Sequence, residues 1–197
     1  MSEVPPAPEV AAVRTQRLLL RGWRLDDRAP FAAMNADPRV MAHFPRLQSR
    51  AESDAFVDRI EHGWRERGFG LWAVERLDTA EFIGFVGLAP VSFAAAFAPA
   101  VEVGWRLAAE HWGRGYASEG GRAALAHGFT TLGFDDIVSF TAETNLKSIA
   151  VMERLGMVRD LEADFEHPAV PVGHRVRPHV LYRLSRQRWL AAARSNA

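Results

Sequence analysis

The sequence predicts a single α/β domain in which strands lie before and between helices. Two observations support this prediction. Runs of β-branched and aromatic residues alternate with segments of helical periodicity. The 197-residue chain is also 48% apolar and 24% charged, which is the composition of one globular domain with its own core. We place that domain at residues 15–197 and expect residues 1–14, with three prolines and two acids, to form a mobile extension.

The N-terminal half is expected to contain a strand, two helices and a three-stranded meander. Ser49 and Glu52 match the capping box that begins a helix, and apolar residues follow at four-residue spacing. Asp78 lies in a polar break between two apolar runs, which predicts a hairpin. The expected segments are a strand at 17–21, a helix ending at 36, a helix ending at about 67, and strands at 69–75, 82–88 and 101–107.

The C-terminal half begins with a glycine-containing loop that leads directly into a helical pattern. Gly133 is the expected C-terminal cap of this helix, and Asn145 is the expected N-cap of the next one. The expected segments are a helix at 117–132, a strand at 137–141, a helix from 145 to 156, a strand at 180–184 and a short tail that contains Trp189.

Composition excludes several classes of protein. The chain has no Cys, so it cannot form a disulfide, a thiolate zinc site or a cysteine nucleophile. Its 24 Lys and Arg balance 24 Asp and Glu, unlike the basic excess of a nucleic-acid-binding domain. The longest apolar tract, residues 88–101, is interrupted by prolines and is too short to span a bilayer. We expect a cytoplasmic protein with no nucleic-acid or membrane partner.

The loop containing Gly113 and Gly115 is the most informative segment for function. Glycines leave room for a ligand beside the backbone, and the following helix presents unpaired N–H groups and its positive dipole end. These features favour a pyrophosphate site, to which Arg114 would add charge. No Lys-Ser/Thr follows the second glycine, and the loop lacks the third glycine of a dinucleotide fingerprint. A tight turn without a ligand and a site for ATP or NAD are the alternatives.

The run VEVGWRLAAEHWGRGYASEGGRAAL, followed by TAETNLKSIAVMERLGMVRD, resembles the GNAT superfamily of acyl-CoA-dependent N-acetyltransferases. It is most similar to the branch of ribosomal-protein N-terminal (alanine/serine) acetyltransferases, whose domain ends resemble TQRLLLRGWRLDD and HVLYRLSRQRW here. The resemblance implies a mixed, largely antiparallel sheet of six to seven strands with about four helices and splayed central strands. Trp112, Gly115 and Ala117 occupy fixed positions of the family's phosphate loop, and Trp112 departs from the usual Gln or Arg.

The resemblance also implies acetyl-CoA as the acyl donor. We expect no metal, because the spacing of the His and acidic residues in segment 164–179 matches no metal motif. Backbone amides of the glycine loop would bind the pyrophosphate, and backbone groups of the preceding strand would pair with the pantetheine arm as a further strand would. Asn145 matches the position that bonds this arm, although a helix cap needs no ligand. The implied donor-binding residues are Trp105, Arg106, Leu107, Trp112, Gly113, Arg114, Gly115, Tyr116, Ala117, Ser118, Asn145 and Ser148.

The implied reaction is direct attack of a neutral primary amine on the thioester, which needs a base and a donor for the leaving sulfur. Glu102 is the candidate base, because it lies on the strand beside the expected thioester, three residues before Trp105. Strand alternation turns it away from the side of Val101 and Val103. A strand acid that faces solvent or pairs with Arg is the alternative. Met152 stands where many members have Tyr, so Ser148 is the candidate donor, with a purely local cap as its alternative.

The acceptor side is less well defined by the sequence. Phe93 and Phe97 lie in an apolar connection at 91–100, which suggests cover by a ligand, a lid or a second subunit in a homodimer. His167 and His174, in the proline-rich segment 164–179, are further acceptor candidates, and this segment also offers an alternative base. The acceptor is expected to be a protein N-terminus or a small-molecule amine. The alternative function is a non-catalytic acyl-CoA-binding or regulatory domain.

Overall fold

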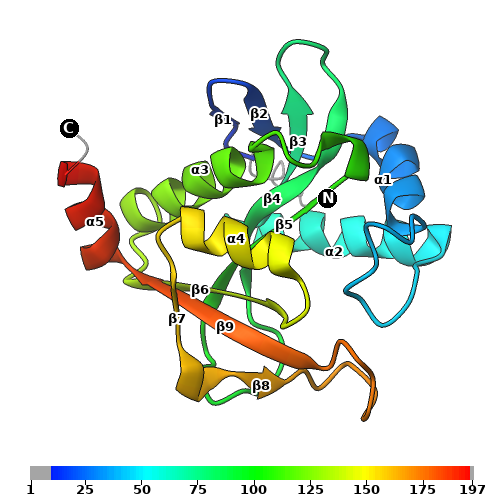
Figure 1. Cartoon of the computed structure of the whole chain (residues 1–197). Coiled ribbons are helices and arrows are strands. Elements are labelled where there is room, and N and C mark those ends of the chain that lie inside the picture. The colour runs from blue at the N-terminus through cyan, green and yellow to red at the C-terminus, as the bar shows by residue number, and fades with distance from the viewer. Residues whose placement is uncertain (1–9, 196–197) are drawn as a thin grey trace, which may run out of the picture.

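The computed structural model describes residues 10–195, which form one open sheet with helices on both sides (Figure 1). Residues 1–9 of the predicted extension lie outside this range. The elements are β1 (Val13–Arg14), β2 (Leu18–Arg21), the short 3-10 helix η1 (Leu25–Asp27), α1 (Arg28–Asn35), α2 (Arg50–Arg67), β3 (Leu71–Arg76), β4 (Phe82–Pro90), β5 (Val101–Leu107), η2 (Ala109–His111), α3 (Tyr116–Thr130), β6 (Asp136–Ala142), α4 (Leu146–Arg154), β7 (Val158–Arg159), η3 (Leu161–Ala163), β8 (Phe165–Glu166), β9 (Pro178–Ser185) and α5 (Arg186–Ser195).

The sheet is mixed and largely antiparallel, as the resemblance implies. Its order is β1-β2-β3-β4-β5-β6-β9-β7, with β8 paired to β9. The central strands β5 and β6 are parallel and share one residue pair, Glu102 with Val138, so the sheet opens between them. Within residues 10–195 it has nine strands rather than six or seven, because three strands of two residues each are too short to show a period. The expected tail around Trp189 is helix α5.

Helix α2 forms as its capping residues predict. The Ser49 Oγ accepts the Glu52 N–H at 3.3 Å, and the Glu52 carboxylate accepts the Ser49 N–H at 2.9 Å. The helix ends before Gly68, whose φ of 73° lies in the left-handed region. Its buried Trp64 packs on Trp72 of β3, with ring centroids 5.1 Å apart, and so joins α2 to the core.

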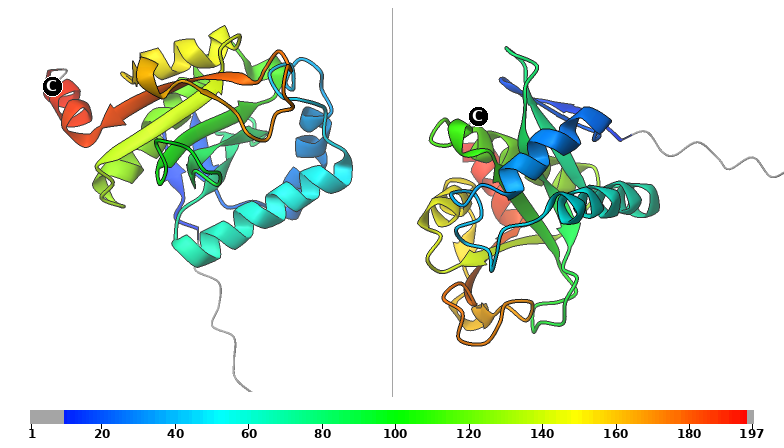
Figure 2. Two further views of the ribbon diagram at one scale, coloured as in Figure 1. Left: turned by 90° about the horizontal axis from the view of Figure 1, so that it is seen from below. Right: turned by 90° about the vertical axis from the view of Figure 1, so that its right-hand side faces the viewer.

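Helix α3 covers the opposite side of the sheet. It ends at Thr130, two residues before the expected end, although Gly133 does adopt a positive φ of 75°. A side chain at Gly128 would lie 2.7 Å from Ile137 Cδ1, so this position must be small for α3 to approach the central strands. Figure 2 shows α2 and α4 on opposite sides of the sheet, which therefore separates two solvent-facing layers.

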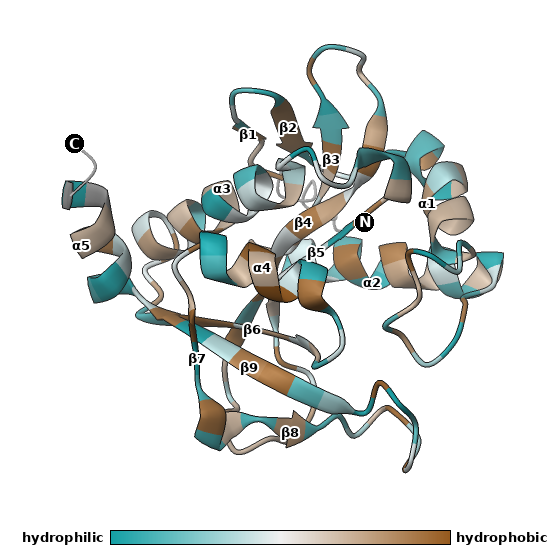
Figure 3. Ribbon diagram, viewed as in Figure 1, coloured by the Kyte–Doolittle hydropathy of each residue, from teal (hydrophilic) through white to brown (hydrophobic). Residues whose placement is uncertain are grey.

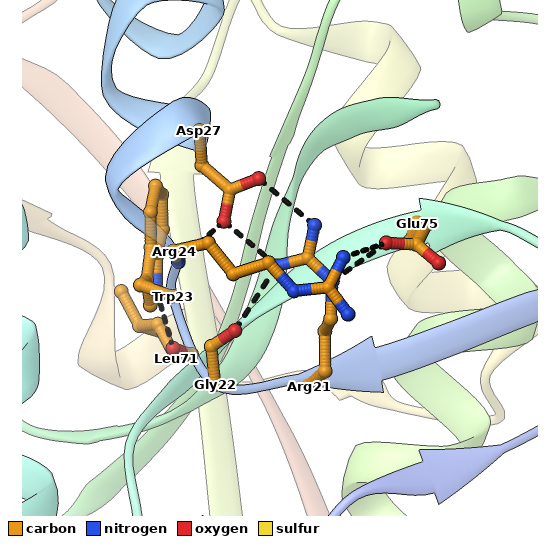
Figure 4. Close-up of polar contacts among 7 residues, drawn as sticks. All are labelled: Arg21, Gly22, Trp23, Arg24, Asp27, Leu71 and Glu75. Carbon is orange, nitrogen blue, oxygen red and sulfur yellow. Dashed lines mark hydrogen bonds and ion pairs between the residues drawn. The ribbon is translucent and has the colours of Figure 1, made fainter. Parts of the chain in front are cut away.

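A buried ion network joins β2, η1 and β3 (Figure 4). Arg21 is 6% exposed and donates from Nη1 and Nη2 to the two oxygens of Asp27, at 2.7 and 2.8 Å. Its Nε donates to Glu75 at 2.8 Å, and Arg24 donates to the same carboxylate. Complete pairing offsets the desolvation that makes an isolated buried charge costly. The network thereby fixes the entry of the chain into α1.

Hydrophobic residues run along β4 and the middle of β9, while α2 alternates between apolar and polar positions (Figure 3). This pattern is typical of central strands covered by amphipathic helices. Across residues 10–195, no helix combines the length and the apolar character that crossing a membrane requires.

Candidate active site

At the opening between β5 and β6, the two faces of the sheet carry different kinds of side chain. Val103 and Leu107 of β5 are buried in the core, whereas Glu102, Gly104 and Arg106 alternate with them and face the layer of α1 and α2. The orientation predicted for Glu102 is therefore confirmed. Paired residues share a face, so Val138 of β6 points to the same side as Glu102.

Glu102 is an unpaired acid in this opening. Among the described residues its half-buried carboxylate has no hydrogen bond or ion pair, so it is neither the salt-bridged nor the fully solvated acid of the alternative. Burial raises the pKa of Glu102 to about 7. Its Oε1 lies 3.7 Å from the position that a Cβ on Gly104 would occupy, so the carboxylate extends along β5 over a residue without a side chain. It can exchange a proton near neutral pH.

The glycine loop has the backbone geometry of an anion site. Gly113 and Gly115 have φ of 72° and 81°, a conformation that other residues rarely adopt. Gly115 is the N-cap of α3, so the loop leads directly to the unpaired N–H groups of the helix's first turn. Apart from its two neighbours in the chain, no residue between 10 and 195 has an atom within 4 Å of a Cβ built on Gly113, which leaves that face open. The loop could hold a pyrophosphate through its backbone.

Arg17 supports this loop from the start of the domain. Its Nη1 donates to the Arg114 carbonyl at 2.9 Å, and its Nε donates to Glu119 in the first turn of α3 at 2.6 Å. Its guanidinium also lies 4.8 Å from the ring centre of the buried Tyr116. The Ser118 hydroxyl is buried without a partner among residues 10–195, so the backbone N–H is the group this residue can offer. Sequence reasoning missed Arg17, because its partners lie about a hundred positions away.

Trp112 has a structural contact at the end of β5. Its Nε1 donates to the Leu107 carbonyl at 2.8 Å, and the Lys147 Nζ lies 4.2 Å from its ring centre. Lys147 was not predicted, and it links α4 to the loop across the opening. Trp105 and Ala117 are half-buried and pack against the core.

The N-terminus of α4 places Ser148 on the α3 side of the sheet. Asn145 is the predicted cap: its Oδ1 accepts the Ser148 N–H at 3.3 Å, and its Nδ2 donates to Thr141 Oγ1 and Ser148 Oγ at 2.9 and 3.0 Å. Ser148 Oγ therefore accepts one bond and keeps its own hydrogen for another acceptor. Met152 is fully buried and offers no donor.

The two phenylalanines of the apolar connection at 91–100 are half-buried against other rings of the chain, and the connection also has exposed residues. Phe93 and Phe97 belong to a ring cluster whose neighbouring centroids are 4.7 to 6.3 Å apart. The cluster consists of Phe93, Phe97, Phe140, Phe165, His167 and His179. Burial, with smaller effects of His179 and Arg177, lowers the pKa of His167 to about 4, so its ring is neutral at pH 7. His174 does not join the cluster: its Nδ1 accepts the Val176 N–H.

The acids of segment 164–179 are engaged elsewhere. Asp164 accepts from Arg159 and from the Leu181 N–H, and Glu166 pairs with Arg177 at 2.8 Å. Both line a cavity of about 260 Å³ together with Glu143, Phe165, Pro178, His179 and Val180. Unlike Glu102, these two carboxylates already have cationic partners.

Comparison with known proteins agrees with this geometry. A family model described as an acetyltransferase (GNAT) domain matches residues 17–158. The uncharacterized protein YkkB of Bacillus subtilis is 32% identical over 144 residues, which cover 73% of this chain and 83% of YkkB. An FsC-acetyl coenzyme A-N(2)-transacetylase of Aspergillus fumigatus is 32% identical over 170 residues, covering 80% and 68%. The crystal structure of an acetyltransferase from Agrobacterium tumefaciens superposes with a TM-score of 0.73 at 28% identity, covering 89% and 95%.

Proposed function

The chain belongs to the GNAT family of N-acetyltransferases, and from that premise we propose that it transfers acetyl from acetyl-CoA to a primary amine by direct attack on the thioester. The observation that carries this mechanism is the unpaired Glu102 beside the opening of the sheet, with a pKa of about 7. A general base works best when its pKa lies near the working pH. A protein that only bound acyl-CoA would have no need of such a carboxylate.

The residues of the α3 side suit the donor. The loop around Gly113 is open, has the left-handed backbone that glycine permits, and leads to the first turn of α3, so the amides of residues 113–118 would bind the pyrophosphate. The backbone of residues 105–107, at the splayed end of β5, would pair with the pantetheine arm. Asn145 would add a contact from α4 through the carbonyl oxygen of its side chain.

The chemical step assigns one task to each side of the sheet. Glu102 takes a proton from the amine, directly or through a water, as the amine nitrogen bonds to the thioester carbon. The carbon–sulfur bond then breaks, and Ser148 Oγ stabilises the departing thiolate by donating a hydrogen bond to it, while its proton stays on the hydroxyl. The products are the N-acetylated amine, the CoA thiolate and protonated Glu102, which loses its proton to solvent. The two residues face different sides, so the thioester would lie in the opening between β5 and β6.

The test is the pH dependence of CoA thiol release with a panel of primary amines. We expect kcat/KM of the wild type, calculated on the concentration of neutral amine, to rise tenfold per pH unit below about 7 as Glu102 ionises, and then to level off. Glu102→Gln should lower this kcat/KM by about 10²- to 10⁴-fold and remove the limb, so that the corrected profile is flat. Ser148→Ala should lower the plateau without moving the midpoint.

Glu166→Gln is the matched control, because Glu166 is an exposed acid already paired with Arg177. It should leave the profile unchanged. If Glu166→Gln or Asp164→Asn removed the limb near pH 7 while Glu102→Gln kept it, the base would belong to segment 164–179.

A further inference from the structure

Arg106 lies on the face of β5 that carries Glu102, and the proposed reaction does not use its side chain. Among residues 10–195 its guanidinium has one hydrogen bond: Nη1 donates to Asn35 Oδ1 at 2.7 Å. Asn35 is fixed in turn by donating from Nδ2 to Ser53 Oγ at 2.9 Å, and both of these residues are fully buried. Polar side chains from α1 and α2 are thus arranged to orient this arginine.

Within the described part of the chain, the other two nitrogens of Arg106 have no hydrogen-bond partner. Nε is buried without a hydrogen bond, and Nη2 donates to no residue between 10 and 195. These two nitrogens form the edge of the guanidinium that binds a carboxylate side-on. By contrast, every guanidinium nitrogen of the buried Arg21 is bonded.

Arg106 also lacks a neutralising charge. Its Cζ lies 4.2, 5.5 and 5.8 Å from the ring centres of Phe44, Phe85 and Phe56, and no described carboxylate pairs with it. Burial lowers the pKa of Arg106 to about 10, so it is still a cation at neutral pH. The rings compensate part of the desolvation cost of this cation, but they supply no hydrogen-bond acceptor for Nε or Nη2.

We propose that Arg106 binds a carboxylate of the acceptor, so that the preferred substrate is a primary amine carrying a carboxylate, such as a free amino acid; this inference rests on the function proposed above. One carboxylate matches the single charge and the free edge of the guanidinium. A phosphate dianion would leave an excess negative charge among the three phenyl rings. The inference favours a small-molecule acceptor over a protein N-terminus.

The order of charges along β5 fits such an acceptor. The Glu102 carboxylate lies over Gly104, and residue 106 is two positions further along, about 7 Å in an extended strand. An acceptor with its amine at Glu102 and its carboxylate at Arg106 would meet complementary charges at both ends. No side chain at position 104 separates the two groups.

The experiment uses two sets of acceptors that differ at one group. The first set is L-phenylalanine, L-phenylalaninamide and 2-phenylethylamine, and the second is 4-aminobutanoate, 4-aminobutanamide and butylamine. Thiol release gives kcat/KM for the wild type, for Arg106→Met and for Arg59→Met. Arg59 is the matched control, because its guanidinium also stacks on Phe56, at 5.5 Å, but is exposed to solvent.

In at least one set, we expect the kcat/KM of the wild type for the carboxylate to exceed that for the other two acceptors by about 10-fold or more. Arg106→Met should lower kcat/KM for that carboxylate by about 10- to 100-fold and for its amide by less than about threefold. Arg59→Met should change neither. Comparing each acceptor between wild type and variant cancels the intrinsic reactivity of the amine.

Two results would overturn the inference. If the wild type acetylates the amides or plain amines as well as the carboxylates in both sets, Arg106 does not select the acceptor, although the proposed function stands. If none of the amines causes thiol release while acetyl-CoA still binds, the proposed function fails as well. The wild-type comparison does not depend on the folding of any variant.

Discussion

The buried Arg21 and the half-buried Glu102 differ in whether their charges are paired. Arg21 is fully paired with Asp27 and Glu75 and holds β2, η1 and β3 together. Glu102 has no hydrogen-bond or ion-pair partner in the part of the chain that the structure describes, and burial raises its pKa. A group left unpaired in this way costs stability whenever it is ionised, which is the usual exchange of stability for reactivity at a catalytic position. The Glu102 carboxylate should therefore have a measurable effect on the free energy of unfolding.

Replacing Glu102 by Gln should stabilise the protein above pH 7 and have no effect near pH 4.5. The folded-state pKa of about 7 lies above the ordinary value of 4.5, so the folded state favours the protonated form. Its contribution to stability is complete below pH 4.5 and is lost as the pH rises through 7. Gln mimics the protonated acid, so the gain at pH 8.5 should reach up to about 3 kcal/mol.

Thermal unfolding of both proteins at pH 4.5 and 8.5 measures this difference. Glu166→Gln, at an exposed and paired acid, controls for the general effect of removing a carboxylate. A gain for Glu102→Gln that was equal at both pH values would show that the carboxylate does not titrate in the folded protein as burial predicts.

At the level of secondary structure, the sequence predicted the long elements and missed the short ones. The end of α2 was expected at about Arg67, where the helix does end, and both ends of β5 were predicted to the residue. The strand at Val13–Arg14 is too short for any period. Helix α3 was extended too far because Gly133 resembles a cap that follows the last turn directly, whereas the helix ends two residues earlier.

In the candidate site too, features set by local sequence were predicted, and contacts between distant segments were not. The facing of Glu102 and the cap at Asn145 follow from local rules of period and hydrogen bonding, and both are confirmed. The contact of Arg106 with Asn35 joins β5 to α1 across 71 positions, and local sequence carries no signal for it. The ring cluster likewise depends on Phe165 returning beside Phe93, which only the paired strands β8 and β9 bring about.

The contacts of Arg17 with the glycine loop should affect the affinity for acetyl-CoA. Arg17→Met removes the bond to the Arg114 carbonyl and the ion pair with Glu119, so we expect the Kd for acetyl-CoA to rise by about tenfold, the loss of one charge-assisted hydrogen bond. Stability without ligand should fall by no more than about 1 kcal/mol, because the arginine is 44% exposed.

Calorimetric titration with acetyl-CoA measures this effect, and Arg50→Met is the control, since Arg50 forms a similar exposed ion pair with Asp54 on α2. Equal affinities of wild type and Arg17→Met would mean that the loop keeps its shape without these contacts.

On the scale of the whole molecule, the sheet divides the proposed reaction into two compartments. The glycine loop, α3 and α4 lie on one side, and α1, α2 and Arg106 lie on the other (Figure 2). The sheet is open between the two sides where β5 and β6 share a single residue pair. A donor held by the loop can reach the acceptor only through this opening, so the pantetheine arm, and not the nucleotide alone, must contribute to binding.

That division predicts which ligands stabilise the fold. Acetyl-CoA at 100 times its Kd should stabilise the native state by about 2.7 kcal/mol, which for a domain of this size raises the Tm by about 5–10 °C. ATP and NAD at the same concentration offer phosphates to the glycine loop but no pantetheine arm for the opening beside β5, so they should raise it far less. Equal shifts with all three would mean that the loop is a general nucleotide site and that the opening does not take part in binding. A shift with acetyl-CoA and CoA alone would place the selectivity in the arm, and therefore between β5 and β6, where Glu102 lies.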